Sequence, residues 1–310
     1  MPKIIFRPNP TPPPFPPPTP VIQPLTFTAQ ENGCRIGYIY YSEDYEVQDA
    51  GLNIEYSLDG GETWLPYTIA TDEAEAQMID LDNGQSIMFR GNNENLAYYL
   101  EDDGGYQGTR FVMEGTFSAS GDITSLLNGV GGVMSIPEYC YYFMFNGCTS
   151  LTQAPALPAT TLANNCYYYM FNGCTSLTQA PSLPATTLAD YCYSSMFQGC
   201  TSLTQAPALP ATTLADYCYY YMFQGCTSLT QAPALPATTL ANGCYSSMFQ
   251  GCTSLSYIEA MFTTTPSTTY TRDWVKNVAA NGTFVKNNAA TWDVSGVNGI
   301  PTGWTVETNP

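Results

Sequence analysis

The sequence of 310 residues contains no histidine, and only 11% of its residues are charged. The chain therefore lacks the commonest general base, the commonest neutral metal ligand and any Ser-His or Cys-His nucleophile pair. Catalysis that relies on carboxylate side chains alone remains possible. We expect a non-enzymatic protein with no cofactor, no catalytic residue and no metal site.

Basic residues are also scarce, with 8 Lys and Arg against 26 Asp and Glu and a net charge of −18. An acidic chain without a Lys/Arg cluster repels nucleic acid, so no nucleic-acid partner is expected. No apolar run is long enough to span a membrane, which predicts no membrane insertion. The start of the chain has no secretion signal, which favours synthesis without export, followed by release on cell lysis.

Residues 1–20 are rich in proline and contain almost nothing that could form a core. Proline fixes φ, so this arm is expected to be an extended polyproline II segment. It is either a disordered leader or an arm that docks on a partner. In the second case the candidate docking residues are Lys3, Phe6, Arg7 and Phe15.

Residues 21–118 show alternating apolar positions and turn signals, which predict a β-sandwich-like domain. The stretch "SLDGGETW" matches the Asp-box pattern and is interpreted as the brace of a hairpin, not as a catalytic element. The clusters "SEDYEVQD" and "EDDGG" could offer oxygen ligands to calcium. They lack the spacing of an EF-hand loop, so solvated loops are the favoured interpretation.

Residues 119–262 contain a 26-residue repeat, "LTQAPALPATTLADYCYYYMFQGCTS", with full copies from residue 151 to residue 254. A fixed period of this length predicts a solenoid in which each repeat packs on its neighbours. Within a copy, "LTQAPAL" predicts a short strand. Cys166 and Met170 have the i, i+4 spacing of a helix that Gly173 would end, so "TTLADYCYYYMF" predicts a helix of two to three turns.

The motif "LPATTLADYCYYYMFQGCTSL" resembles the BspA-like class of bacterial leucine-rich repeats. The tail "WVKNVAANGTFVKNNAATWDVSGVNGIPTGWTV" and the front segment resemble the regions around such repeats in proteins of gut anaerobes and their phages. The resemblance implies surface adhesion and recognition. We therefore predict a multidomain chain in four parts: a proline-rich arm (1–20), an all-β sandwich-like domain (21–118), an α/β leucine-rich-repeat solenoid (119–262) and a C-terminal capping segment (263–310).

Ten cysteines recur in two columns with the period of 26 residues. Stacked repeats lie about 4.8 Å apart, which is too far for ideal disulfide geometry, and the spacing does not match known zinc sites. Buried free thiols are therefore favoured over disulfides, and disulfides over a metal. These candidate core cysteines are Cys140, Cys148, Cys166, Cys174, Cys192, Cys200, Cys218, Cys226, Cys244 and Cys252.

Two faces of the repeats are candidate ligand surfaces. One is a ladder of hydroxyls and amides on the strand side, in which Pro155 also points outward while Ala154 and Ala156 point inward. This ladder could bind a repetitive glycan or form an inert wall. The other face carries tyrosine pairs that alternate with serine pairs, either packed over the serines or exposed to sugars or protein. The candidate residues are Thr152, Gln153, Thr178, Gln179, Thr204, Gln205, Thr230, Gln231, Tyr168, Tyr169, Tyr220 and Tyr221.

These features favour a structural and adhesion protein of a phage virion, a fibre or decoration protein of head or tail. Its arm, residues 1–20, would dock on capsid or tail proteins, and its repeats would bind a glycan or protein of the host surface. A homo-oligomer is compatible with this function. The alternative is an adhesin on the bacterial cell surface.

Overall fold

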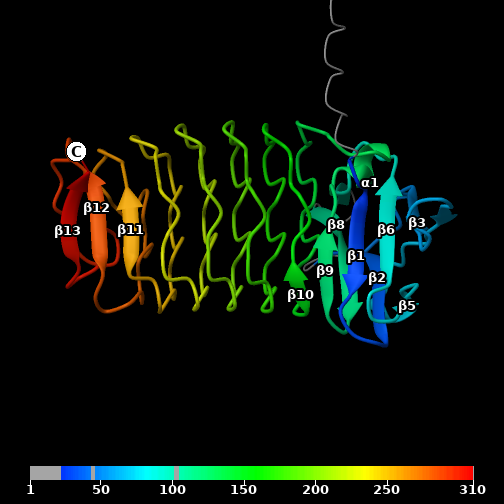
Figure 1. Ribbon diagram of the computed structural model, residues 1–310. Coiled ribbons are helices and arrows are strands. Elements are labelled where there is room, and N and C mark those ends of the chain that lie inside the picture. Colours follow the sequence, from blue (N-terminus) through cyan, green and yellow to red (C-terminus); the bar gives the residue numbers. More distant parts are fainter. Residues whose placement is uncertain (1–21, 43–45, 101–104, 310) are drawn as a thin grey trace, which may run out of the picture.

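The computed structural model describes residues 22–42, 46–100 and 105–309. Two β-sheets form the N-terminal part, and a row of stacked loop layers extends from one side of them to the C-terminus (Figure 1). The arm with Lys3, Phe6, Arg7 and Phe15 lies outside the described residues, as do parts of both acidic clusters.

The first sheet has the strand order β10-β9-β1-β6-β3-β4, and the second has the order β5-β2-β8-β7. Pairing is antiparallel throughout, except that β10 runs parallel to β9. In chain order the strands are β1 (Leu25–Ala29), β2 (Cys34–Tyr41), β3 (Ile54–Ser57), β4 (Leu65–Pro66), β5 (Ile79–Leu81), β6 (Ser86–Gly91), β7 (Tyr98–Leu100), β8 (Gly105–Glu114), β9 (Phe117–Ser120) and β10 (Leu151–Gln153).

The space between the two sheets is filled by aromatic rings. Phe27 of β1 lies 4.6 Å from Phe111 of β8, measured between ring centroids, and Phe111 lies 4.4 Å from Tyr38 of β2. Alternate residues of β1 are buried, as expected for a strand with one face on a core.

This core continues without a break into the loop layers. Strand β9 of the first sheet pairs with β10 of the first repeat copy, and the ring of Phe145 stacks on Phe111 at 5.5 Å. From Phe145 the stack passes through Phe171, Phe197 and Phe223, one ring per layer, with centroid distances of 5.1 to 5.7 Å. The sequence-based boundary at residue 118 therefore falls inside β9.

The segment of each repeat around its first cysteine is a series of hydrogen-bonded turns. Odd-numbered residues of the second layer donate their amides to the next layer, as Tyr167 does to Cys192 at 3.0 Å and Phe171 to Met196 at 2.9 Å. Even-numbered residues donate three residues back within the layer, as Met170 does to Tyr167 at 3.2 Å. Left-handed φ values recur every four residues, at Asn165 (57°), Tyr169 (56°) and Gly173 (71°).

The prediction of an α/β leucine-rich-repeat solenoid is wrong. Within the described residues the helical segments are the four-residue α1 (Ser125–Asn128) and the three-residue 3-10 helix η1 (Glu73–Glu75), and neither lies in the repeat copies. A helix over "TTLADYCYYYMF" would need every amide for bonds within its own layer. The left-handed residues interrupt that pattern, and every second amide binds the neighbouring layer instead.

The predicted strand in each repeat is also mostly absent. Only the first copy forms one, β10, and the later copies meet through isolated bridges such as Gln153 to Gln179 and Gln179 to Gln205. Pro155 is buried and Ala156 is exposed, so the expected directions of these two side chains are reversed. Proline has no amide hydrogen, which is why regular pairing ends at that point.

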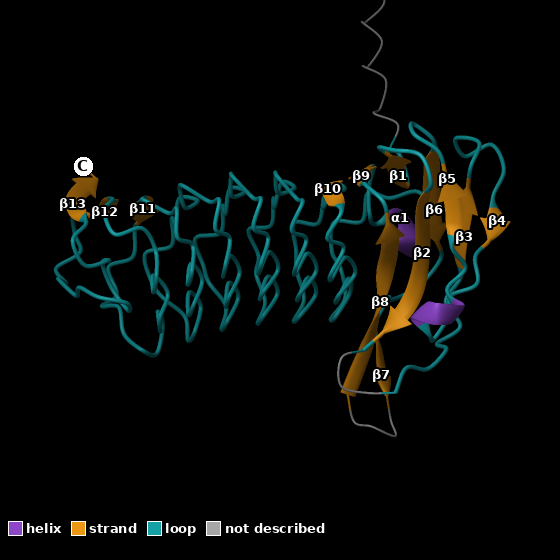
Figure 2. Cartoon of the chain, turned by 90° about the horizontal axis from the view of Figure 1, so that it is seen from below, coloured by secondary structure: helices purple, strands orange, loops and turns teal. Residues whose placement is uncertain are grey.

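The C-terminal residues form a parallel three-stranded sheet of β11 (Tyr257–Ala260), β12 (Thr283–Asn287) and β13 (Thr305–Asn309), which continues the row of layers (Figures 1 and 2). Trp274 is fully buried against the last repeat, 6.2 Å from both Tyr245 and Phe249. Its indole nitrogen donates to the carbonyl of Gly299 at 2.8 Å. A large ring therefore ends both aromatic columns of the repeats.

Candidate functional site on the tyrosine face

One face of the layers carries the column of paired tyrosines and serines. In the second layer, Tyr168 stacks on Tyr142 at 5.2 Å and Tyr169 stacks on Phe143 at 5.6 Å. The next layer has Ser194 and Ser195 in these positions, and both serines are buried. The tyrosine pairs are half-buried, so they both cover the serines and present part of their rings to solvent.

The first serine pair leaves no open gap because a second column of tyrosines covers it. Tyr191, in the same layer as these serines, stacks on Tyr217 of the next layer at 4.7 Å with nearly parallel rings. Tyr168 lies 6.4 Å from Tyr191, which closes the gap from the other side.

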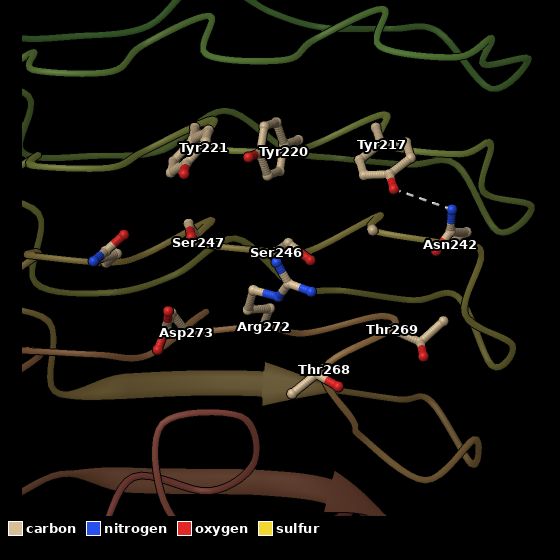
Figure 3. Close-up of a pocket in the computed structure, with 12 residues that line it drawn as sticks. Tyr217, Tyr220, Tyr221, Asn242, Ser246, Ser247, Thr268, Thr269, Arg272 and Asp273 are labelled. Carbon is tan, nitrogen blue, oxygen red and sulfur yellow. Dashed lines mark hydrogen bonds between the residues drawn. The ribbon is translucent and has the colours of Figure 1, made fainter.

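The second serine pair lies at the base of an open pocket with a volume of about 490 Å³. Here the layer reads "NGCYSS" instead of "DYCYSS", so Gly243 replaces the tyrosine that covers the first pair. Figure 3 shows Tyr217, Tyr220 and Tyr221 on one side of this pocket, with Ser246 and Ser247 beneath them. The lining residues are Tyr217, Tyr220, Tyr221, Asn242, Gly243, Ser246, Ser247, Gln250, Thr268, Thr269, Arg272 and Asp273.

Arg272 and Asp273 form the opposite wall. They stand 26 positions after Ser246 and Ser247, and the amide of Ser247 donates to the carbonyl of Arg272 at 2.7 Å. They therefore occupy the place that a tyrosine or serine pair has in the repeats. Asp273 forms an ion pair with Lys276 at 3.8 Å, its one salt bridge among the described residues.

A ladder of side-chain amides ends at the same pocket. Asn172 donates to Gln198 at 2.9 Å, Gln198 donates to Gln224, and Gln224 donates to Gln250 at 2.8 Å. Gln250 receives a bond on its oxygen, and its amide nitrogen has no partner among the described residues. It can therefore donate to a ligand.

Two phenols of this face, those of Tyr168 and Tyr220, stay neutral at physiological pH. Burial raises the pKa of Tyr168 well above its usual value, with a further rise from Tyr169. Burial likewise raises the pKa of Tyr220, and the guanidinium of Arg272 offsets part of that rise. Tyr217 accepts a hydrogen bond from the side-chain amide of Asn242 at 3.2 Å. The wall of the pocket is thus aromatic surface with hydroxyl groups.

The threonine and glutamine ladder lies on another face and is separate from this pocket. Thr152 is half-buried because its hydroxyl donates to the carbonyl of Phe117 at 2.9 Å. The other predicted residues are exposed, and four of them line a shallow hollow of about 540 Å³. The exposed residues are Gln153, Thr178, Gln179, Thr204, Gln205, Thr230 and Gln231, and the last four line the hollow.

All ten candidate core cysteines are buried free thiols. In one column each thiol donates to a phenylalanine carbonyl of the preceding layer, as Cys174 does to Phe145 and Cys200 to Phe171, both at 3.1 Å. This first column consists of Cys148, Cys174, Cys200, Cys226 and Cys252. The second column consists of Cys140, Cys166, Cys192, Cys218 and Cys244.

The Asp-box forms a closed turn next to β3. Asp59 accepts hydrogen bonds from the amide of Thr63 at 2.9 Å and from the hydroxyl of Thr63 at 2.5 Å. These bonds hold the pKa of Asp59 well below its usual value. The indole of Trp64 donates to the carbonyl of Gly61 at 3.0 Å, and Arg90 lies over its ring. The side chains of Ser57, Asp59, Thr63 and Trp64 thus bond within the turn.

No group of histidine, cysteine or acidic residues in the described part of the chain could hold a metal ion. Among the same residues, no helix is long and apolar enough to cross a membrane.

Sequence reasoning found the tyrosine pairs but missed Gly243, Gln250 and Arg272. Gly243 could have been found as the position where a repeat loses its large side chain. Arg272 stands in the degenerate copy, where the sequence alone does not establish the register.

The comparisons with known proteins identify no relative. No family model matches the chain, and no curated protein or solved structure is similar to it.

Proposed function

We propose that this chain is a non-enzymatic attachment protein that binds a glycan of a cell surface through the tyrosine face of its layers. A phage virion is the setting we prefer, with residues 1–20 docked on capsid or tail proteins. A bacterial surface adhesin is the alternative setting, and both use the same binding face.

The pocket beside Tyr217 and Tyr220 carries this proposal. A sugar ring offers an apolar face of C–H groups and an edge of hydroxyl groups. Aromatic side chains pack well against the C–H face, and fixed polar groups form hydrogen bonds with the hydroxyl groups. In this pocket the tyrosine rings stand next to Ser246 and Gln250, so both kinds of contact are within one hollow of about 490 Å³.

The repeated layers add a reason for a polymeric ligand. Tyr168 and Tyr169 recur two layers later as Tyr220 and Tyr221, and the second column of tyrosines stacks Tyr191 on Tyr217 in successive layers. A glycan chain that ends in the pocket could therefore run over further half-exposed tyrosines. Several weak contacts along one chain raise the total affinity.

A glycan array probed with the full chain tests the proposal. We expect binding to a defined set of glycans, and we expect Tyr220→Ser to weaken it. Thr204→Ala and Gln205→Ala, on the other face, are matched controls that should leave it unchanged. Absence of binding to every glycan, or equal loss in the controls, would contradict the proposal. Immunogold labelling of cells and released particles then separates the virion from the bacterial surface.

A further inference from the structure

Arg272 differs from the other basic residues that the structure describes. Arg35, Arg90, Arg110 and Lys276 each form an ion pair with a carboxylate. Lys286 donates to the carbonyl of Trp292 at 2.9 Å and lies over its ring. The guanidinium of Arg272, in contrast, has neither a carboxylate partner nor a hydrogen-bond acceptor among the described residues.

This unpaired charge faces the pocket. Figure 3 shows the Arg272 side chain extending toward Ser246, across from the tyrosine wall. The nearest acid on the same wall, Asp273, is occupied by Lys276, and its backbone amide is bonded to Asn298 at 2.7 Å. Asp216, near the Asn242 end of the pocket, accepts the amide of Asn242 at 3.0 Å. In a chain with a net charge of −18, the pocket thus contains one available positive group.

We infer that the pocket binds an acidic sugar, with the sugar carboxylate on Arg272 and the sugar ring against Tyr217 and Tyr220. A guanidinium presents parallel N–H donors that match the two oxygens of a carboxylate, and such paired bonds are the strongest of the ordinary hydrogen bonds. The free amide nitrogen of Gln250 donates to a ring hydroxyl. This inference rests on the proposed glycan binding and specifies its ligand as a uronic acid or a related carboxylate-bearing sugar.

The test compares pairs of methyl glycosides that differ only at one carbon, where one has a carboxylate and the other a hydroxymethyl group. The pairs are methyl glucuronide with glucoside, methyl galacturonide with galactoside, and methyl mannuronide with mannoside. Calorimetric titration of the full chain at low salt measures each affinity. For at least one pair we expect about tenfold tighter binding of the acidic sugar, the ratio expected from one charge-assisted contact at an exposed site.

Arg272→Gln should abolish this ratio, because it weakens binding of the acidic glycoside far more than binding of the neutral one. Arg35→Gln is the matched control, because it removes the same charge from β2, outside the pocket, and should keep the ratio. Because Arg272 is exposed, thermal unfolding should show that both variants fold. The ratio should also fall as salt is added, since the contact is open to solvent.

Equal affinities for the acidic and neutral members of all three pairs would overturn the inference, as would a ratio that survives Arg272→Gln. If glycans on the array bind without preference for acidic sugars, the glycan-binding function stands and the inference fails. If no glycan on the array and no glycoside binds, both fail.

Discussion

The ring of Tyr217 occupies the place where a side chain on Gly243 would begin. A β-carbon on Gly243 would come within 2.3 Å of two ring carbons of Tyr217. The missing side chain at position 243 thus leaves room for the Tyr217 ring, and both residues line the pocket. At the equivalent positions of the two preceding layers, Tyr191 and Tyr217 stack with nearly parallel rings, 4.7 Å apart between centroids.

Gly243→Tyr should therefore close the pocket. Gly243 has φ 59°, and Tyr191 and Tyr217 hold the same left-handed conformation at 57° and 55°, so a tyrosine is compatible with this backbone. We expect the free energy of unfolding to fall by about 1 kcal/mol, the order of the left-handed cost. We expect glycan affinity to fall by about tenfold or more, which corresponds to about 1.4 kcal/mol.

Gly243→Ala is the matched control for this variant. It has the same left-handed strain and also displaces the Tyr217 ring, but it leaves the pocket unfilled. Because Tyr217 is a wall of the pocket, titration should show some loss of affinity, but a smaller loss than for Gly243→Tyr. Equal losses in the two variants would mean that the orientation of Tyr217, and not the open volume, controls binding.

The burial pattern of the repeat explains why the sequence predicted a helix. Buried residues occur in adjacent pairs four positions apart, such as Cys166 and Tyr167, followed by Met170 and Phe171. A helix places residues at i and i+4 on one face, so this pattern is nearly the same as that of an amphipathic helix. The two structures differ in the carbonyl group to which each backbone amide donates its hydrogen bond. In the loop layers, every second acceptor belongs to the neighbouring layer. A single repeat does not reveal it.

The site was predictable only in part. Tyr220 and Tyr221 were candidate ligand residues, because the alternation with serine pairs is visible in the repeats. The opposite wall was not predictable, because Arg272 and Asp273 come after the degenerate segment 257–271. Their register with Ser246 and Ser247 is established by the hydrogen bonds between the layers, such as the one from Ser247 to Arg272.

The buried thiols should be inert to thiol reagents in the native protein. Burial raises the pKa of Cys148 and of Cys200 to about 12, so the reactive thiolate is absent near neutral pH. We expect none of the ten cysteines of the two columns to react with an aromatic disulfide reagent at about pH 8, a pH below these raised pKa values. All eleven cysteines should react after denaturation. Rapid reaction of the native protein would contradict the buried columns.

The same thiols predict loss of stability in alkali. Their folded-state pKa is raised above the unfolded value of 9.0, so their contribution is fully present below pH 9 and decreases as pH rises toward about 12. Buried tyrosines such as Tyr67, whose pKa burial raises to about 12, act in the same direction. Urea titrations near neutral pH and at about pH 10.5 should show a lower free energy of unfolding at the higher pH, which lies inside that interval. An unchanged value would contradict this prediction.

The phenylalanine column should be a main source of stability. Phe197 is fully buried and stacks on Phe171 at 5.6 Å and on Phe223 at 5.7 Å. Phe197→Ala removes both contacts and leaves a cavity, which should lower the free energy of unfolding by about 3–5 kcal/mol. Phe197→Leu should cost less, because it refills part of the space. Urea titration measures both, and a loss below about 1 kcal/mol for the alanine variant would contradict a close-packed column.

The amide ladder should stabilise the layers in a way that depends on hydrogen bonding and not on volume. Gln224 accepts from Gln198 and donates to Gln250, so Gln224→Met keeps the side-chain size but removes the acceptor of the Gln198 amide nitrogen and the donor to the Gln250 oxygen. For these half-buried groups we expect a loss of about 1 kcal/mol in the free energy of unfolding, measured in urea. Gln205→Met is the matched control, because Gln205 is exposed and its side chain has no hydrogen-bond partner in the described structure. The free energy of unfolding of the control variant should stay within about 0.5 kcal/mol of the wild-type value. Equal effects of the two substitutions would show that the ladder bonds contribute nothing beyond what water supplies.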